Sequence, residues 1–242
     1  MTYLTFHLLF FLPPLAVLAF LNHRRPRVAF GGLRPATAVV AVAFIALIYT
    51  TPWDNYLVWR GVWAYGPDRV LGTIGYVPFE EYLFFLLQPL LTGAWLTYVL
   101  SRQGASAPPR KARTARWVGA AFYAAAALAG LLVLRREPTV YLGLILVWSG
   151  PVLALQWAYA ASRYLQLLRP LLWAVATPTL YLWIADRIAI ASGIWRISER
   201  FTTGLQLAGL PMEEAVFFLM TNLLVVQGVV LFVVAGRQRG TL

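Results

Sequence analysis

The stretch PFEEYLFF at residues 78–85 recurs as PMEEAVFF at residues 211–218. Each copy begins a long apolar segment, so each places two adjacent carboxyl groups at the mouth of a candidate membrane helix. A charge deep in a bilayer costs about 2.5–3.5 kcal/mol, and less near the interface. One copy alone is an ordinary helix start, because proline suits the first turn and acids complement the helix dipole. Two copies, each followed by the same pair of phenylalanines, indicate a function beyond capping.

The composition is that of a polytopic membrane protein. Of the 242 residues, 60% are apolar and 12% are charged, and the mean hydropathy is +0.69. Soluble domains are about 45–50% apolar and about 25% charged. The chain has no cysteine and only two histidines, both near the N-terminus, so we expect no metal centre and no cysteine nucleophile. The net charge of +11 does not indicate a nucleic-acid partner, because the basic residues lie between apolar segments.

A helix needs roughly 20 apolar residues to cross a bilayer core of about 30 Å. Seven segments fit, so the sequence predicts an all-α polytopic membrane helix bundle. The second segment is short, and the sixth ends near Asp186 and Arg187. The segments are approximately residues 3–21, 36–53, 79–100, 116–134, 140–161, 169–191 and 211–235.

The basic residues predict the orientation of these segments. The first, third and fifth connections and the C-terminal tail hold 13 of the 20 Lys and Arg residues. Basic loops stay on the cytoplasmic side. We therefore expect an outer N-terminus and a cytoplasmic C-terminus, which places all nine acidic residues at or near the outer side.

The chain contains an internal repeat. The two Glu-Glu pairs are 133 residues apart, and both the Asp54–Asp186 and the Trp63–Trp195 spacings are 132 residues. Tyr3-Leu4 and Tyr141-Leu142 are 138 apart. We expect one three-helix repeat in residues 1–100, a basic linker and connector helix in 101–138, and a second repeat in 139–242. One connector helix gives the repeats the same orientation, an arrangement that usually places a site between them.

The helical faces distinguish the four glutamates. Glu81 lies on the same helix face as Gln88, two turns later, and Glu214 lies on the same face as Thr221 and Asn222. Glu80 and Glu213 instead share their faces with apolar residues. Polar groups within membrane helices usually face the bundle interior. We therefore expect Glu81 and Glu214 to point inward as candidate proton donors or acceptors, with Glu80 and Glu213 as tuning neighbours or caps. The repeated Asp54 and Asp186 are further catalytic candidates, or else solvated interfacial acids.

Aromatic residues supply the candidate substrate contacts. Many of them, including Tyr65, fit an aromatic belt at the outer interface. Some ring faces instead suit the stabilisation of a carbocation, as they do other cations. The candidates for substrate binding are Phe84, Phe85, Phe217, Phe218, Trp63, Trp195, Gln88 and Asn222.

The usual nucleotide, phosphate, zinc and serine-hydrolase motifs are missing, so the sequence indicates no cofactor. The repeated Pro-x-Glu-Glu-x-x-Phe-Phe pattern and the three-plus-one-plus-three layout resemble the lycopene cyclases of the heterodimeric or fused type, over nearly the whole chain. The resemblance implies an integral enzyme of the cell membrane that converts the linear ends of lycopene to β-ionone rings. It also implies a carotenoid substrate, contact with membrane lipid, and a carboxyl acid and base acting without net redox change.

Three alternatives stay open at this stage. A cyclase for C50 carotenoids, or one that forms ε or γ rings, would carry the same motifs. A proton-coupled transporter also uses repeated intramembrane carboxylates, and a membrane scaffold would need no chemistry. The number of active sites, the oligomeric state, and which glutamate is acid or base are not fixed by the sequence.

Overall fold

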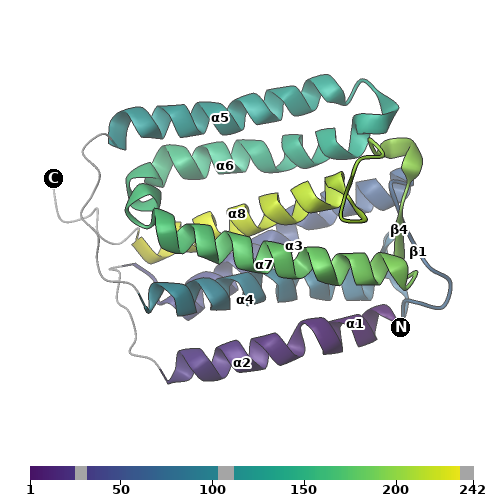
Figure 1. The fold of residues 1–242 in the computed structure, drawn as a ribbon, viewed down its shortest axis with the longest axis horizontal. Coiled ribbons are helices and arrows are strands. Elements are labelled where there is room, and N and C mark those ends of the chain that lie inside the picture. The colour runs from purple at the N-terminus through teal and green to yellow at the C-terminus, as the bar shows by residue number, and fades with distance from the viewer. Residues whose placement is uncertain (25–31, 103–111, 235–242) are drawn as a thin grey trace.

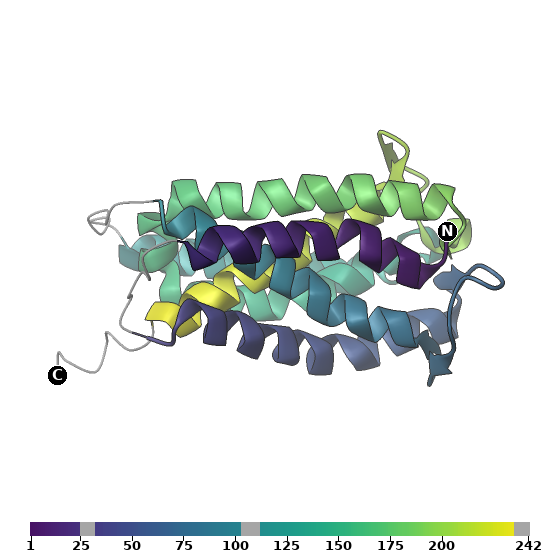
Figure 2. The same ribbon diagram turned by 90° about the horizontal axis from the view of Figure 1, so that it is seen from below.

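The structure is a computed structural model that describes residues 1–24, 32–102 and 112–234. Its long helices run side by side along one axis, and the N-terminus lies at the same end as the short strands (Figures 1 and 2). The helices are α1 (Tyr3–Phe10), α2 (Leu12–His23), α3 (Pro35–Arg60), α4 (Phe79–Leu100), α5 (Ala112–Val133), α6 (Val140–Gln166), α7 (Leu168–Ala191) and α8 (Met212–Val234), with two single turns, η1 (Glu137–Thr139) and η2 (Glu199–Phe201).

Helices α1 and α2 form one membrane segment with a break at Phe11. The break has a local cause, since Pro13 and Pro14 lack the amide hydrogens that a continuous helix would use there. Thr2 begins the segment, and its hydroxyl accepts a hydrogen bond from the amide of Thr5 at 3.2 Å.

The predicted all-α membrane bundle is confirmed. Within the described residues, six helical segments are long and apolar enough to cross a membrane. Helix α7 is not among them, since it contains Pro178 and carries Asp186 and Arg187 near its C-terminal end, although it runs the length of the bundle. Helix α3 continues to Arg60, beyond the predicted end at residue 53, so Asp54 lies inside a helix and not at its end.

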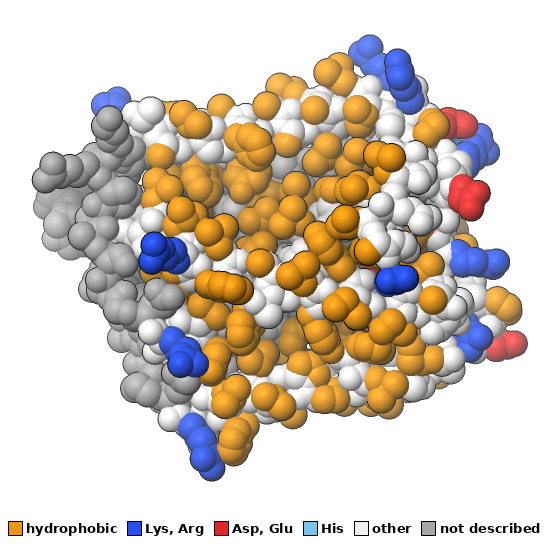
Figure 3. All heavy atoms as spheres, viewed as in Figure 1, with side chains coloured by type: hydrophobic (Ala, Val, Ile, Leu, Met, Phe, Trp, Pro, Cys, Tyr) orange, Lys and Arg blue, Asp and Glu red, His pale blue; other side chains and the backbone are white. Residues whose placement is uncertain are grey.

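The surface supports a membrane location. Hydrophobic side chains cover the middle of the face in Figure 3, and charged side chains gather at its two ends. Large apolar residues are exposed on several helices, among them Ile48 on α3, Phe122 on α5 and Leu155 on α6. Such a continuous apolar surface requires lipid around it.

In the part of the chain that the structure describes, three two-stranded sheets lie at one end of the bundle, and the sequence did not predict them. Strand β1 (Trp63–Tyr65) pairs antiparallel with β4 (Trp195–Ile197), and Ala64 faces Arg196 at the centre of the register. Two hairpins, β2 (Thr73–Ile74) with β3 (Val77–Pro78) and β5 (Gln206–Leu207) with β6 (Leu210–Pro211), lead directly into α4 and α8. Strands of two or three residues are too short for a period-two pattern to reveal them.

Helix α8 is central, since it packs against α3, α4, α6 and α7. Helix α5, at the position of the predicted connector, packs chiefly against α6. Gly130 and Gly143 let these two backbones approach closely, because a Cβ at Gly143 would lie 2.9 Å from the carbonyl oxygen of Gly130. Of the predicted basic linker, residues 103–111 lie outside the described residues.

Candidate active site

The two Glu-Glu pairs occupy the first turns of α4 and α8, directly after the hairpins. All four side chains are buried: Glu80 and Glu213 are 0% exposed, Glu81 is 4% and Glu214 is 2%. Neither pair is therefore a solvated cap. Buried carboxyls need partners or a proton, so their contacts indicate what each one does.

Glu81 accepts hydrogen bonds from two phenols. The hydroxyl of Tyr3 lies 2.7 Å from Glu81 Oε2, and that of Tyr65 lies 3.0 Å from the same oxygen. Burial raises the pKa of Tyr65 well above its ordinary value, and the nearby Glu81 and Asp54 raise it further. Tyr65 therefore keeps its proton and serves as a donor.

Glu214 has a different environment. No hydrogen bond of good geometry reaches it from the described residues, and its buried Oε1 has no partner among them. Tyr141, the counterpart of Tyr3 in the repeat, is the phenol that interacts with Glu214, although no hydrogen bond of good geometry joins the two.

The two repeated aspartates are buried as well, with Asp54 at 0% exposure and Asp186 at 1%. Asp186 accepts a hydrogen bond from the indole nitrogen of Trp195 at 2.8 Å. In the other half, Asp54 corresponds to Asp186 and Trp63 to Trp195, but no hydrogen bond joins Asp54 and Trp63. Both oxygens of Asp54 lack partners among the described residues. Neither aspartate is the solvated interfacial acid that the sequence left open.

Glu80 and Glu213 hold the preceding loops in place. Glu80 Oε1 accepts from the amide of Leu71 at 2.9 Å. Glu213 Oε1 accepts from the amide and the hydroxyl of Thr203, at 2.7 and 2.8 Å. These matched contacts favour a structural capping function for both residues over a direct part in proton transfer.

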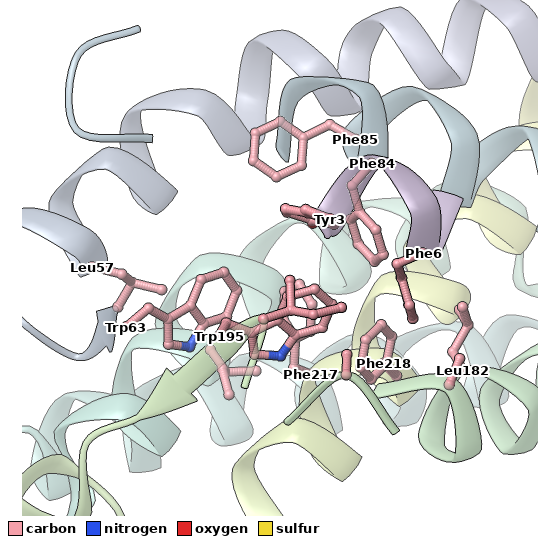
Figure 4. Packing of buried hydrophobic residues seen from close by; sticks show 14 of the residues in the cluster. Tyr3, Phe6, Leu57, Trp63, Phe84, Phe85, Leu182, Trp195, Phe217 and Phe218 are labelled. Atoms are coloured by element: carbon pink, nitrogen blue, oxygen red, sulfur yellow. The ribbon is translucent and has the colours of Figure 1, made fainter. Parts of the chain in front are cut away.

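Three carboxyls from the two halves of the chain meet at one small cavity of about 20 Å³. Aromatic rings form its walls, and Figure 4 shows several of them converging from different helices. The ring centroids of Tyr3 and Trp195 are 4.9 Å apart, and those of Trp63 and Phe217 are 5.8 Å apart. The lining residues are Tyr3, Trp63, Tyr65, Glu81, Phe84, Asp186, Trp195, Glu214, Phe217 and Phe218.

A second, larger cavity of about 350 Å³ lies beside the first, among α3, α4, α6 and α8. Phe84 and Phe217 line both cavities and so stand between them. Phe85 and Gln88 line the larger one, whose walls are otherwise almost entirely apolar. A space of this kind suits a long hydrocarbon.

The larger cavity reaches the lipid-facing surface between α3 and α6. Ile45 on α3 and Tyr159 on α6 line it and are 52% and 58% exposed. Nearer the carboxyls the two helices are bridged, because the hydroxyl of Tyr49 donates to the carbonyl oxygen of Trp148 at 2.8 Å. The side opening therefore lies on the side of this bridge away from the acids.

Gln88 and Asn222 meet in a buried network. Gln88 Nε2 and the hydroxyl of Thr92 donate to Asn222 Oδ1 at 2.8 and 2.6 Å, and Asn222 Nδ2 donates to the hydroxyl of Thr179 at 3.0 Å. Gln88 lines the large cavity, whereas Asn222 is absent from its lining residues. Asn222 therefore joins helices, and of these two residues Gln88 is the one that lines the large cavity.

Sequence reasoning missed the phenols that contact the carboxyls. Tyr65 fits the predicted interfacial belt, but it is partly buried and bonds to Glu81 in the site, unlike the exposed Tyr56 and Trp59. The repeat of Tyr3 at Tyr141 was a usable signal, since both lie beside the glutamate of their own half.

Comparison with known proteins identifies the family. The family model described as lycopene cyclase matches residues 1–99 and 138–232. The chain belongs to the lycopene cyclase family. The lycopene beta-cyclase of Halobacterium salinarum (strain ATCC 29341 / DSM 671 / R1) is 41% identical to it over 96% of this chain and 95% of its own length.

Fungal members of the lycopene cyclase family are also similar. The bifunctional lycopene cyclase/phytoene synthase of Arthroderma gypseum is 34% identical over 94% of this chain and 40% of its own length. That of Aspergillus niger is 39% identical over 77% of this chain and 33% of its own length. No solved structure matches the chain.

Proposed function

We propose that this chain is a lycopene β-cyclase, an intramolecular lyase or isomerase that converts lycopene to β-carotene through γ-carotene. The observation that carries the proposal is the meeting of Glu81, Asp186 and Glu214 in one aromatic cavity beside a long apolar one. The near full-length similarity to the Halobacterium lycopene beta-cyclase supports the choice of substrate and ring.

The chemistry needs only a proton donor and a proton acceptor. A carboxylic acid protonates C2 of the terminal C1=C2 bond and leaves a tertiary cation at C1. The C5=C6 bond attacks C1, so the C1–C6 bond closes the ring and the cation moves to C5. A carboxylate removes the proton from C6 and leaves the C5=C6 double bond of the β ring. One proton enters and one leaves, and the aromatic walls stabilise the cation while excluding water.

One centre serves both ends of the substrate in this proposal. The two Glu-Glu motifs lie in different halves, but Glu81 and Glu214 line the same cavity. Lycopene would enter and have one linear end converted to a ring. Its other linear end would then bind at the same centre for a second reaction. γ-Carotene is then an obligatory intermediate.

The polyene occupies the larger cavity and its end group reaches the acids. The smaller cavity, about 20 Å³, is too small for an end group as it stands. Phe84 and Phe217 separate the two spaces, so rotation of these side chains would admit the end group and place their rings beside the cation. Substrate enters from the bilayer between α3 and α6.

The same proposal includes the membrane arrangement. Residues 1–100 and 139–242 form like-oriented halves around a pseudo-two-fold axis, with 101–138 as linker and connector. The register of β1 and β4 supports this, because Trp63 pairs with Ile197 and Tyr65 pairs with Trp195, as a two-fold axis through the central pair requires. The N-terminus and the acidic site face outward and the C-terminus faces the cytoplasm, which reporter fusions at both ends would test.

Expression in a lycopene-accumulating bacterium tests the function. Cells should change from red to orange-yellow, with β-carotene and transient γ-carotene identified by chromatography. Accumulation of ε or γ rings would correct the ring type. Unchanged lycopene, with membrane insertion verified, would contradict the proposal.

A further inference from the structure

The repeat is broken at one position in the site. Tyr65 on β1 corresponds to Ile197 on β4, because each lies two residues after the repeated tryptophan of its half. Glu81 therefore has a second phenol beside it, Tyr65, and Glu214 has no equivalent of this phenol. The hydrogen bonds of good geometry that the described residues donate differ along the cavity: Glu81 accepts two, Asp186 accepts one and Glu214 accepts none, its one neighbouring phenol being Tyr141.

These contacts distinguish the protonation states of the two glutamates. Both phenols point at the same oxygen, Glu81 Oε2. A protonated oxygen can donate its hydrogen to only one of them, so at least one phenol donates to the carboxyl group. Hydrogen bonds donated to a carboxylate favour its charged form. A buried carboxyl without such donors is stabilised in its neutral, protonated form.

We infer that Glu214 is the acid that protonates lycopene, that Glu81 is the base that completes the ring, and that Tyr65 is a positioning residue acting through Glu81. The inference deepens the proposed function and rests on it. Glu214 gives its proton to C2 and becomes a carboxylate. After ring closure Glu81 takes the proton from C6, and the C6–H electron pair becomes the C5=C6 bond.

The cycle closes by return of the proton from Glu81 to Glu214. Both residues line the cavity of about 20 Å³, which is large enough for about one water molecule. A single bridging water can carry the proton across it once the product end has left. The environment of each residue then restores the starting state, since the phenols again favour the charged form of Glu81.

The separate removal of each carboxyl tests the assignment. Each variant is incubated in membranes with lycopene, and the products are separated by chromatography with mass detection. Glu214→Gln should return unreacted lycopene, because no proton reaches the substrate. Glu81→Gln should still form the cation, which loses a different proton to give ε or γ ends or is trapped by water as an alcohol. Cation-derived products from Glu214→Gln, with none from Glu81→Gln, would overturn the assignment.

Tyr65→Phe tests the positioning residue with a readout that a structural defect does not move. We expect β-carotene formation to fall at least about ten-fold, the effect of losing one hydrogen bond to a charged group. The fraction of ε and γ rings should rise, because Glu81 is charged less of the time and is held less firmly beside C6, so that other protons leave. Tyr56→Phe is the matched control, since Tyr56 is an exposed phenol outside the site, and it should behave as wild type.

The failures of the two proposals can be told apart. A Tyr65→Phe chain with the wild-type rate and ring ratio contradicts the part assigned to Tyr65. A wild-type chain that makes no β-carotene in the same assay contradicts the proposed function itself.

Discussion

Thr92 on α4 donates a 2.6 Å hydrogen bond to Asn222 on α8, in a fully buried contact between the two Glu-Glu helices. Gln88 and Thr179 complete the amide's partners, so Asn222 connects α4, α7 and α8. Rigid contacts of this kind keep the first turns of α4 and α8, and so their glutamates, at a fixed separation.

Thr92→Val should therefore destabilise the bundle. Interhelical hydrogen bonds in membrane proteins contribute about 0.6 kcal/mol on average and up to about 1.7 kcal/mol. We expect the upper part of that range, because the buried Asn222 Oδ1 loses one of its two donors. Thr97→Val is the control, since among the described residues the Thr97 hydroxyl bonds only to the carbonyl oxygen of Gly93 on its own helix. Equal unfolding free energies in detergent for the two variants would contradict the structural importance of this network.

The two members of each Glu-Glu pair should respond differently to amide substitution. Glu81→Gln should lower β-carotene formation by about 10²–10⁴-fold, the usual contribution of a general acid or base. Glu80→Gln should lower it by less than about ten-fold, because the amide oxygen can still accept from Leu71. Rates measured in membranes at matched expression check this. Similar losses in both variants would mean that Glu80 takes part in the chemistry.

Filling the larger cavity should exclude the substrate. Gly228 lines it, and a Cβ there would lie 3.3 Å from Gln156 Nε2, the end of a flexible side chain. Gly228→Ala should be tolerated, whereas Gly228→Leu should abolish cyclisation by occupying the polyene path. Thermal unfolding of both variants separates blockage from misfolding. A folded Gly228→Leu chain with full activity would place the substrate elsewhere.

The side opening can be probed because the chain has no cysteine. In an Ile45→Cys variant, a bulky membrane-soluble maleimide should label the opening and inhibit cyclisation at least about ten-fold, and added lycopene should slow the labelling. Ile48→Cys is the matched control, since Ile48 is 74% exposed on the same helix but does not line the cavity. Equal inhibition at both positions would argue against entry between α3 and α6.

Mass-labelled water should mark the protonation step. When the reaction runs in D₂O, the water that relays the proton between Glu81 and Glu214 is D₂O, so Glu214 receives deuterium and delivers it to C2 of each new ring. We expect one deuterium per ring, and two in β-carotene, by mass spectrometry. β-Carotene without deuterium would mean that the donor proton is shielded from solvent and recycled, and that the small cavity stays closed between turnovers.

The sequence by itself determined the membrane bundle, the helix boundaries to within a few residues at most ends, and the repeated carboxyls. These features depend on short stretches of sequence. A run of about 20 apolar residues forms a helix in lipid, and a proline followed by two acids begins a helix. The segment predicted at 79–100 matches α4 at both ends. Glu81 and Glu214 were also distinguished from their neighbours by the sequence, because each shares a helix face with polar residues. Both line the small cavity.

Only the tertiary structure decided which partners each carboxyl has. Tyr3 and Tyr65 reach Glu81 across 78 and 16 residues of chain, and the pairing of β1 with β4 brings Trp195 beside Tyr65 across the repeat. A hydrogen bond requires the donor–acceptor distance to be correct to within a few tenths of an ångström. The spacing of two residues in the sequence does not specify distances that finely. For the same reason, the sequence did not show that Asn222 on α8 is hydrogen-bonded to groups on α4 and α7. The repeat predicts two equivalent glutamates, and the packing makes them unequal.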